Sequence, residues 1–243
     1  MARESRKKIR GCDMNLDIPL MLESIPSLYS AAIVTIKLTV LSSFFGLLLG
    51  AILSLLRYSH SSALRRFAAT YSLIFRGTPL IVQLFIIYYG LAQASALRES
   101  PLWIVFKDPV RCAVIALGLN SAAYTSEIIR AAVNSVPKGQ WEAAKVLGLG
   151  QFLVFRLVVA PQALRFALPS YGNEIIMLMK GTALASTISL FDLTGRAKTL
   201  VAETYAPYEI FILVALIYLL LGLALQSLVK WGEAKVRLPS PSG

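Results

Sequence analysis

The chain has 243 residues, of which 56% are hydrophobic and 15% are charged. Soluble domains carry about 25% charged residues, so this composition excludes an ordinary soluble fold. A net charge of +11 would fit nucleic-acid binding in a soluble protein. Here the basic residues lie near the ends of apolar segments and do not alternate with aromatic residues, so we expect no nucleic-acid partner.

Five apolar segments are long enough to cross a bilayer, which takes roughly 20 helical residues for about 30 Å of hydrocarbon. Glu174 and Lys180 interrupt the fourth segment, which is the weakest. No internal repeat or linker divides the chain. We predict an all-α membrane protein with about five transmembrane helices and a single domain over residues 14–243. The expected spans are residues 30–56, 74–94, 112–133, 168–190 and 210–229.

The charges of the connections orient the chain. Arginine and lysine predominate after the first and third spans and in the C-terminal tail, whereas the connections over residues 91–109 and 191–209 have balanced charges. Because positively charged loops stay in the cytoplasm, we expect the C-terminus inside and, with five spans, the N-terminus outside.

The N-terminal residues conflict with this topology. No short apolar region with a cleavage site follows them, as a signal peptide requires. We hypothesise that translation starts at Met14 and that residues 1–13 are a mis-assigned extension. The basic residues that would otherwise face outward are Arg3, Arg6, Lys7, Lys8 and Arg10.

The sequence has no pattern typical of a metal site or of an enzyme. Cys12 and Cys112 lie far apart and His60 is the single histidine, whereas a zinc or iron site needs clustered ligands. There is no G-x-x-x-x-G-K-[ST] phosphate loop. We therefore expect no metal, no catalytic residue and no cofactor bound by this chain.

A polar, helix-prone segment follows the third span, from Glu142 to Gly148. Pro137 suits the first turn of a helix, and Gly148 and Gly150 suit its end. A short helix held outside the membrane by two flanking spans has a good shape for docking a soluble partner.

The segment from Glu142 to Pro161 resembles the EAA loop of ABC-importer permeases. Val158 and Ala160 replace the usual isoleucine and leucine. The resemblance implies that residues 137–161 form a cytoplasmic coupling loop, whose helix sits in a cleft of a dimeric ABC ATPase that binds ATP and Mg²⁺ and hydrolyses ATP. The residues that match the pattern at its spacing are Glu142, Ala143, Ala144, Gly148 and Pro161.

Four further motifs are similar to permeases of the histidine and glutamine importer type. The likeness covers about residues 28–231 and is greatest for M-type subunits of histidine, arginine or opine importers. It implies the type I ABC importer permease fold in a bacterial inner membrane, a homologous Q-type permease as partner, and an external solute-binding protein. The sequence does not identify the amino acid or opine. The motifs are Arg76–Gln83, Ala123–Arg130, Ser135–Gln140 and Asn173–Glu174.

Glu174 needs an explanation, because a charge inside the membrane is costly and usually faces a bundle interior or a water-filled cavity. Its carboxylate either binds a cationic group of the substrate or pairs with Lys180 or Arg76 of this chain.

Uncharged polar residues accompany it. Gln83, Asn120 and Tyr124 lie in the second and third spans, and Asn173 precedes Glu174. Such groups either line the substrate pathway or bond to neighbouring helices. We treat all four as candidate pathway residues, with both roles open.

Two other features concern the structure of the helices and the contacts between them. Gly77 and Pro79 disrupt helix regularity beside Arg76, as a hinge or as a tolerated kink. Glu127 and Arg130 have i, i+3 spacing near the end of the third span, which favours a structural or subunit-interface role.

We interpret the chain as the permease subunit of a binding-protein-dependent ABC importer for polar, cationic amino acids or opines. The alternative is a secondary transporter or channel that uses Glu127, Glu174 and Lys180 as a proton relay. That alternative lacks the internal repeat expected of such transporters and leaves the coupling loop unexplained. A scaffold subunit without a transport path is the third interpretation.

Overall fold

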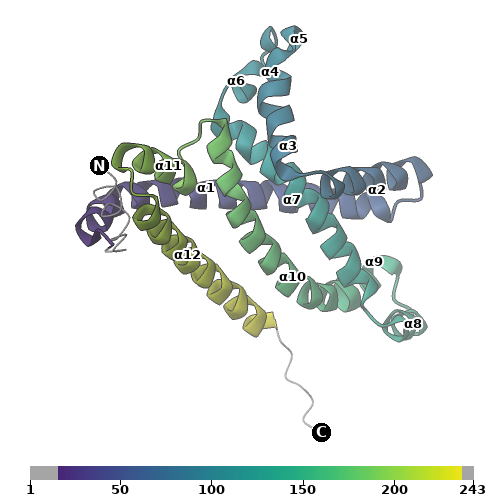
Figure 1. The fold of residues 1–243 in the computed structure, drawn as a ribbon. Helices are drawn as coiled ribbons and strands as arrows, with labels where there is room; N and C mark the ends of the chain where they lie inside the picture. Colours follow the sequence, from purple (N-terminus) through teal and green to yellow (C-terminus); the bar gives the residue numbers. More distant parts are fainter. Residues whose placement is uncertain (1–15, 237–243) are drawn as a thin grey trace, which may run out of the picture.

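The computed structural model describes residues 16–236, and within that range it contains helices and no strand (Figure 1). The predicted extension 1–13 and the start at Met14 lie outside the described residues. Between residues 16 and 236, four helical segments are long and apolar enough to cross a membrane, and a bent helix pair makes a fifth. The four are Ile18–Arg57 (α1), Pro109–Asn134 (α7), Gln151–Ile188 and Pro207–Val236 (α12).

Shorter helices connect and interrupt these spans. The third long segment is composite: α9, a π-helical stretch at Phe155–Val159, α10 and a 3₁₀ stretch at Thr182–Ile188. Another π-helical stretch, Ile86–Gly90, separates α3 from α4. The shorter helices are α2 (Ser62–Gly77), α3 (Leu80–Phe85), α4 (Leu91–Gln93), α5 (Ser95–Arg98), α6 (Trp103–Phe106), α8 (Lys138–Val146), α9 (Gln151–Val154), α10 (Ala160–Gly181) and α11 (Leu193–Thr204).

Helix α1 is longer than predicted, beginning at Ile18 instead of Ser30. The Asp17 side chain accepts from Leu20 N over 3.0 Å and caps it. The early turns bury Leu28 against α11 and α12, which compensates for Pro26 inside the helix. With 40 residues, α1 is about 60 Å long, about twice the hydrocarbon thickness.

Helices α1 and α7 pack closely because small residues face each other. A Cβ on Gly46 would lie 2.9 Å from Ser121 Cβ, and one on Gly50 would lie 2.7 Å from Thr125 Cβ. The two glycines with G-x-x-x-G spacing therefore lie where α1 contacts α7.

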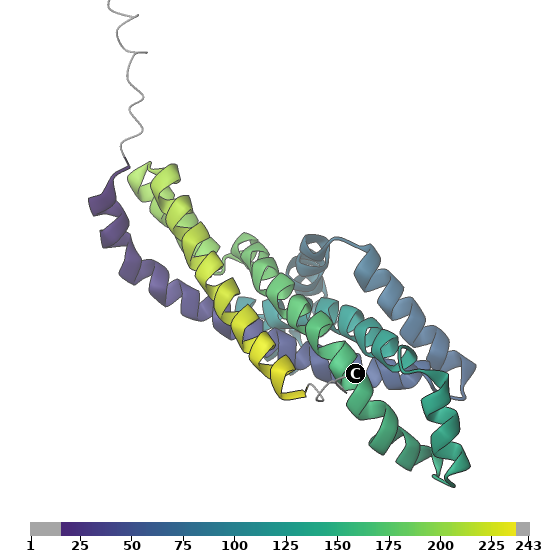
Figure 2. The same cartoon turned by 90° about the horizontal axis from the view of Figure 1, so that it is seen from below.

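Helices α10 and α12 lie side by side and run antiparallel (Figures 1 and 2). A Cβ on Gly172 would clash with the Val229 side chain, and one on Gly232 would lie 3.6 Å from Leu168. The fourth span was predicted to start at residue 168, but helical structure runs continuously from Gln151. The second half of the predicted coupling loop therefore belongs to this long segment.

The predicted second span, residues 74–94, is not one straight helix. Residues 62–77 already form α2, and Leu80–Gln93 continues after a bend of 105°. The start of α2 was not predicted because this helix is amphipathic, with Arg65 and Arg66 in its first turns, and the prediction relied on purely apolar stretches.

Candidate functional site

The exposed helix α8 projects at one end of the molecule beside α9 (Figure 1). Pro137 is its N-cap residue and lies directly before the first turn, in which the sequence analysis had placed it. At the other end Gly148 adopts a positive φ of 76°, which glycine adopts without strain. Gly148 N donates to Lys145 O over 2.9 Å and Leu149 N donates to Ala144 O over 3.2 Å. This is a Schellman motif, and it ends the helix sharply.

One face of α8 is fixed to the body of the protein. Ala144 is 3% exposed and packs in a cluster with Val133, Val154 and Val159 from α7, α9 and the π-helical stretch. The small alanine side chain lets the helix lie close to these neighbours. Ala144 therefore connects α8 to the ends of two long helical segments.

The other face of α8 is open. Glu142, Ala143 and, further along, Pro161 are exposed. Val146 is 87% exposed and Leu147 is 78% exposed. Sequence reasoning did not select these two residues, although two adjacent apolar residues on a polar helix are a readable signal. Two adjacent exposed apolar side chains on a polar helix favour a contact with a partner surface.

A second feature is the bend between α2 and α3, where Pro79 cannot donate a backbone hydrogen bond. The Gln83 amide fills this gap: it donates to Phe75 O over 2.8 Å and to Thr78 Oγ1 over 2.7 Å. Asn120 Nδ2 on α7 donates to Phe75 O and to Gln83 Oε1, each over 3.0 Å. The bend is thus braced by side chains on both sides.

A cavity of about 860 Å³ lies between this bend, α7 and α10. Of the predicted pathway residues, it brings together Asn120, Tyr124, Asn173 and Glu174, whereas Gln83 is not among its lining residues. Pro79 also lines the cavity, so the bend forms part of its wall.

Glu174 forms no ion pair with any of residues 16–236. The pairing with Lys180 or Arg76 that we weighed is therefore absent, although Lys180 lines the same cavity.

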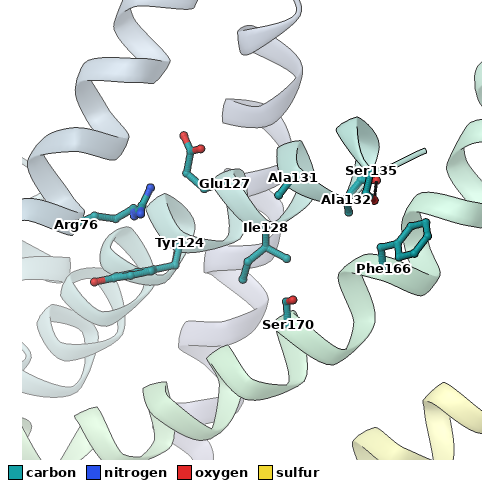
Figure 3. Close-up of a pocket in the computed structure, with 9 residues that line it drawn as sticks. All are labelled: Arg76, Tyr124, Glu127, Ile128, Ala131, Ala132, Ser135, Phe166 and Ser170. Carbon is teal, nitrogen blue, oxygen red and sulfur yellow. Dashed lines mark hydrogen bonds between the residues drawn. The ribbon is translucent and has the colours of Figure 1, made fainter. Parts of the chain in front are cut away.

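A smaller cavity of about 420 Å³ adjoins the first, since Tyr124, Ile128 and Ser170 line both. Figure 3 shows Arg76 beside the Tyr124 ring and Glu127 further along α7. The Arg76 guanidinium carbon lies 5.6 Å from the ring centroid, within the range of a cation–π contact. A cationic side chain thus lines the smaller cavity, next to a tyrosine that lines both.

Glu127 joins α7 to the end of α1 and is not among the lining residues of the larger cavity. Its carboxylate contacts Arg130 over 2.7 Å and Arg57, at the end of α1, over 3.3 Å. The Tyr58 hydroxyl donates to Asn134 Oδ1 over 3.2 Å in the same region. The arginine from α1 was not anticipated, because sequence spacing reveals only partners on the same helix.

Within residues 16–236, no group of three or more histidine, cysteine, aspartate or glutamate side chains is placed to hold a metal ion.

Comparison with known proteins identifies close relatives. Residues 42–238 match the family described as "Binding-protein-dependent transport system inner membrane component". The chain is 45% identical to the nopaline transport system permease protein NocM of Agrobacterium fabrum, covering 90% of this chain and 91% of that protein. It is 38% identical to the histidine/lysine/arginine/ornithine transport system permease protein HisM of Salmonella typhimurium, covering 85% and 88%.

Solved structures agree with this. A chain from the crystal structure of an amino acid ABC transporter with histidines superposes with a TM-score of 0.82 at 36% identity, covering 91% of this chain and 99% of that chain. A chain of the methionine ABC transporter MetNI superposes with a TM-score of 0.75 at 19% identity, covering 89% and 99%, and it supports the fold alone.

Proposed function

The chain belongs to the family of inner membrane components of binding-protein-dependent transport systems, and from this premise we propose that it imports cationic amino acids or opines across a bacterial inner membrane. The nopaline, octopine, arginine and histidine permeases among its relatives support this substrate class. The family also leaves the secondary-transporter alternative without support.

The observation that carries the substrate class is Glu174. It lines a cavity of about 860 Å³ on the side of a membrane helix and has no ion-pair partner in residues 16–236. Asn173 and Asn120 add amide groups nearby. A carboxylate in such surroundings attracts an ammonium or guanidinium group, and the amides provide donors and acceptors for the remaining polar atoms.

The energy is supplied by a partner. The proposed partner is an ABC ATPase dimer that receives the open face of α8, with Glu142 at the surface and Val146 and Leu147 as apolar anchors. ATP and Mg²⁺ belong to that dimer. In this arrangement α8 and the C-terminus lie on the cytoplasmic side, and the N-terminus lies outside.

Closure of the ATPases would push on α8, which is packed on the ends of α7 and α9 through Ala144, Val133 and Val154. The push would rock these segments and open the cavity to one side or the other, an equilibrium biased by nucleotide. The bend at Pro79 forms one wall of the cavity and is placed to act as its hinge.

The remaining partners follow from the same proposal. A homologous Q-type permease completes the translocation path, and an external solute-binding protein delivers the substrate. The relatives that carry M-type names support such a pair.

Reconstituted uptake tests this proposal. The chain is purified with the ATPase, the second permease and the binding protein encoded beside it, and placed in liposomes loaded with ATP. We expect binding-protein-dependent uptake of radiolabelled arginine, histidine or an opine, and no uptake of glutamate. Uptake driven by a proton gradient without ATP would contradict the proposal.

A further inference from the structure

The cytoplasm-facing end proposed for α12 has a composition typical of a membrane boundary. The apolar surface of α12 includes the exposed Leu228, and it is followed by Lys230, Trp231, Glu233 and Lys235. Trp231 is 62% exposed, and Lys235 Nζ lies 3.7 Å from its ring centroid. Tryptophan and lysine at the end of an apolar span mark the level of the lipid headgroups.

A pocket of about 130 Å³ lies at this level between α10 and α12. Leu168 and Pro169 of α10 and Val236 of α12 provide its apolar walls. Its two charged residues are Arg165 of α10 and Glu233 of α12. The pocket therefore lies at a membrane boundary. This placement does not depend on which side of the membrane that end of α12 faces.

The two charges in this pocket have no ion-pair partner among the residues that the structure describes. Arg165 and Glu233 form no ion pair with each other or with any other of residues 16–236. Arg165 Nε is buried and has no hydrogen-bond partner there. A buried polar atom without a hydrogen bond is costly, and a ligand that bridges Arg165 and Glu233 would provide that bond.

We propose that this pocket binds the headgroup of a phospholipid that carries both a phosphate and a primary ammonium group, such as phosphatidylethanolamine. The phosphate oxygens would accept from the Arg165 guanidinium, whose planar donors suit a phosphate. The ammonium group would donate to the Glu233 carboxylate. The acyl chains would extend along the exposed apolar surface of α12 near Leu228.

The pair of opposite charges decides the lipid class. A purely anionic headgroup would be attracted by Arg165 and repelled by Glu233. A choline headgroup has no N–H to donate to a carboxylate. Basic pockets between transmembrane helices are known sites for anionic lipids, and the carboxylate of Glu233 distinguishes this pocket from them.

Native mass spectrometry of the full chain, with the subunits that co-purify with it, tests the assignment. Synthetic phosphatidylethanolamine, phosphatidylglycerol and phosphatidylcholine are titrated separately, and the apparent affinity of the first bound lipid is measured. We expect phosphatidylethanolamine to bind at least about tenfold more tightly than the others, which corresponds to about 1.4 kcal/mol.

Two variants assign the contacts. Arg165→Gln is expected to reduce phosphatidylethanolamine binding at least about tenfold, and Glu233→Gln is expected to abolish the preference over phosphatidylglycerol. Lys230→Gln is the matched control, since it removes an exposed charge at the same level without touching the pocket. Arg165→Lys retains the charge and covers the case in which Arg165→Gln fails to fold.

Three results would overturn the proposal. The first is equal affinity for the three lipids in the wild-type chain. The second is unchanged selectivity in both pocket variants, with Lys230→Gln as the only change that weakens binding. The third is loss of ATPase association in Arg165→Gln at unchanged lipid affinity, which would make the pocket a protein contact.

Soluble phosphoethanolamine is titrated in parallel, and binding as tight as that of the lipid would exclude a lipid site.

Discussion

The side-chain amide of Asn120 on α7 donates to Gln83 Oε1 of α3 over 3.0 Å. Both amides also donate to Phe75 O, the carbonyl that the chain bend leaves without its helical partner. Asn120 is 9% exposed and Gln83 is 7% exposed, so this network is nearly shielded from solvent. In this conformation the two residues brace the bend at which the chain leaves α2 and enters the wall of the cavity.

Asn120→Ala should therefore destabilise the protein by about 1–3 kcal/mol, because Gln83 Oε1 would lose its donor in a buried environment. The measurement is the thermal unfolding midpoint in detergent. Asn173→Ala is the control: Asn173 also lines the cavity but is exposed. Its free energy of unfolding should stay within about 0.5 kcal/mol of the wild type, and an equal loss of stability in both variants would contradict the bracing role.

The bend shows where sequence reasoning stopped. Arg76, Gly77 and Pro79 correctly indicated a break, and Gln83 and Asn120 were correctly noted as polar groups needing partners. A single sequence does not reveal that these features satisfy one another, because the hydrogen bonds join residues of α2, α3 and α7. Gln83 braces the bend and is not among the residues that line the cavity, and its pathway role stays a prediction.

Gly148→Ala should destabilise α8 by about 1–2 kcal/mol, since an alanine at a φ of 76° meets the steric penalty of left-handed backbone. No atom lies within 4 Å of the added Cβ, so the effect would come from the backbone alone. Proteolytic sensitivity of the 137–150 segment measures it. Gly150→Ala is the matched control, because Gly150 has a φ of −65° and equally open surroundings. Equal sensitivity of the two variants would count against the Schellman cap.

Glu174→Gln should weaken affinity for a cationic substrate about 10- to 100-fold, because a charge-assisted hydrogen bond contributes about 1.5–3 kcal/mol. Substrate concentration dependence of ATP-driven uptake measures this. Glu203→Gln, an exposed residue of α11, is the control and should leave uptake unchanged. A Glu174→Gln protein with unaltered affinity and preference would remove Glu174 from the pathway.

Asp192, the cap of α11, should make stability depend on pH. The residue is 0% exposed, and burial raises the pKa of its carboxyl from the ordinary 3.8 to about 6, against the opposing effects of Gly195 N, Thr194 N and the Lys198 charge. The folded state therefore holds the proton more tightly than the unfolded state. Its stabilising contribution is complete below about pH 4 and is lost as the pH rises through about 6.

Unfolding midpoints of wild type and Asp192→Asn between pH 4 and pH 7 test this, since asparagine retains the cap without titrating. The difference between the free energies of unfolding of the two proteins should change by about 1–3 kcal/mol between pH 4 and pH 7. A constant difference would contradict the raised pKa.

The long helices show how far the sequence sufficed. Apolar stretches predicted α1, α7, α10 and α12, because membrane spans must be apolar over a fixed length. Their ends were misplaced where packing extends a helix beyond the apolar stretch, as Leu28 does for α1. Val146 and Leu147 were not predicted as site residues, because the EAA pattern includes Glu142 and Gly148 but not these two positions.

The most direct test of the central claim is substrate-stimulated ATPase activity in proteoliposomes containing this chain with its ATPase, second permease and binding protein. Wild type is compared with Glu142→Lys plus Gly148→Asp, which change the open face and the end of α8 while the unfolding midpoint monitors the fold. The coupling role of α8 predicts loss of substrate stimulation in a folded complex. Undiminished stimulation would contradict it, since α8 would then not transmit force from the ATPase to the cavity.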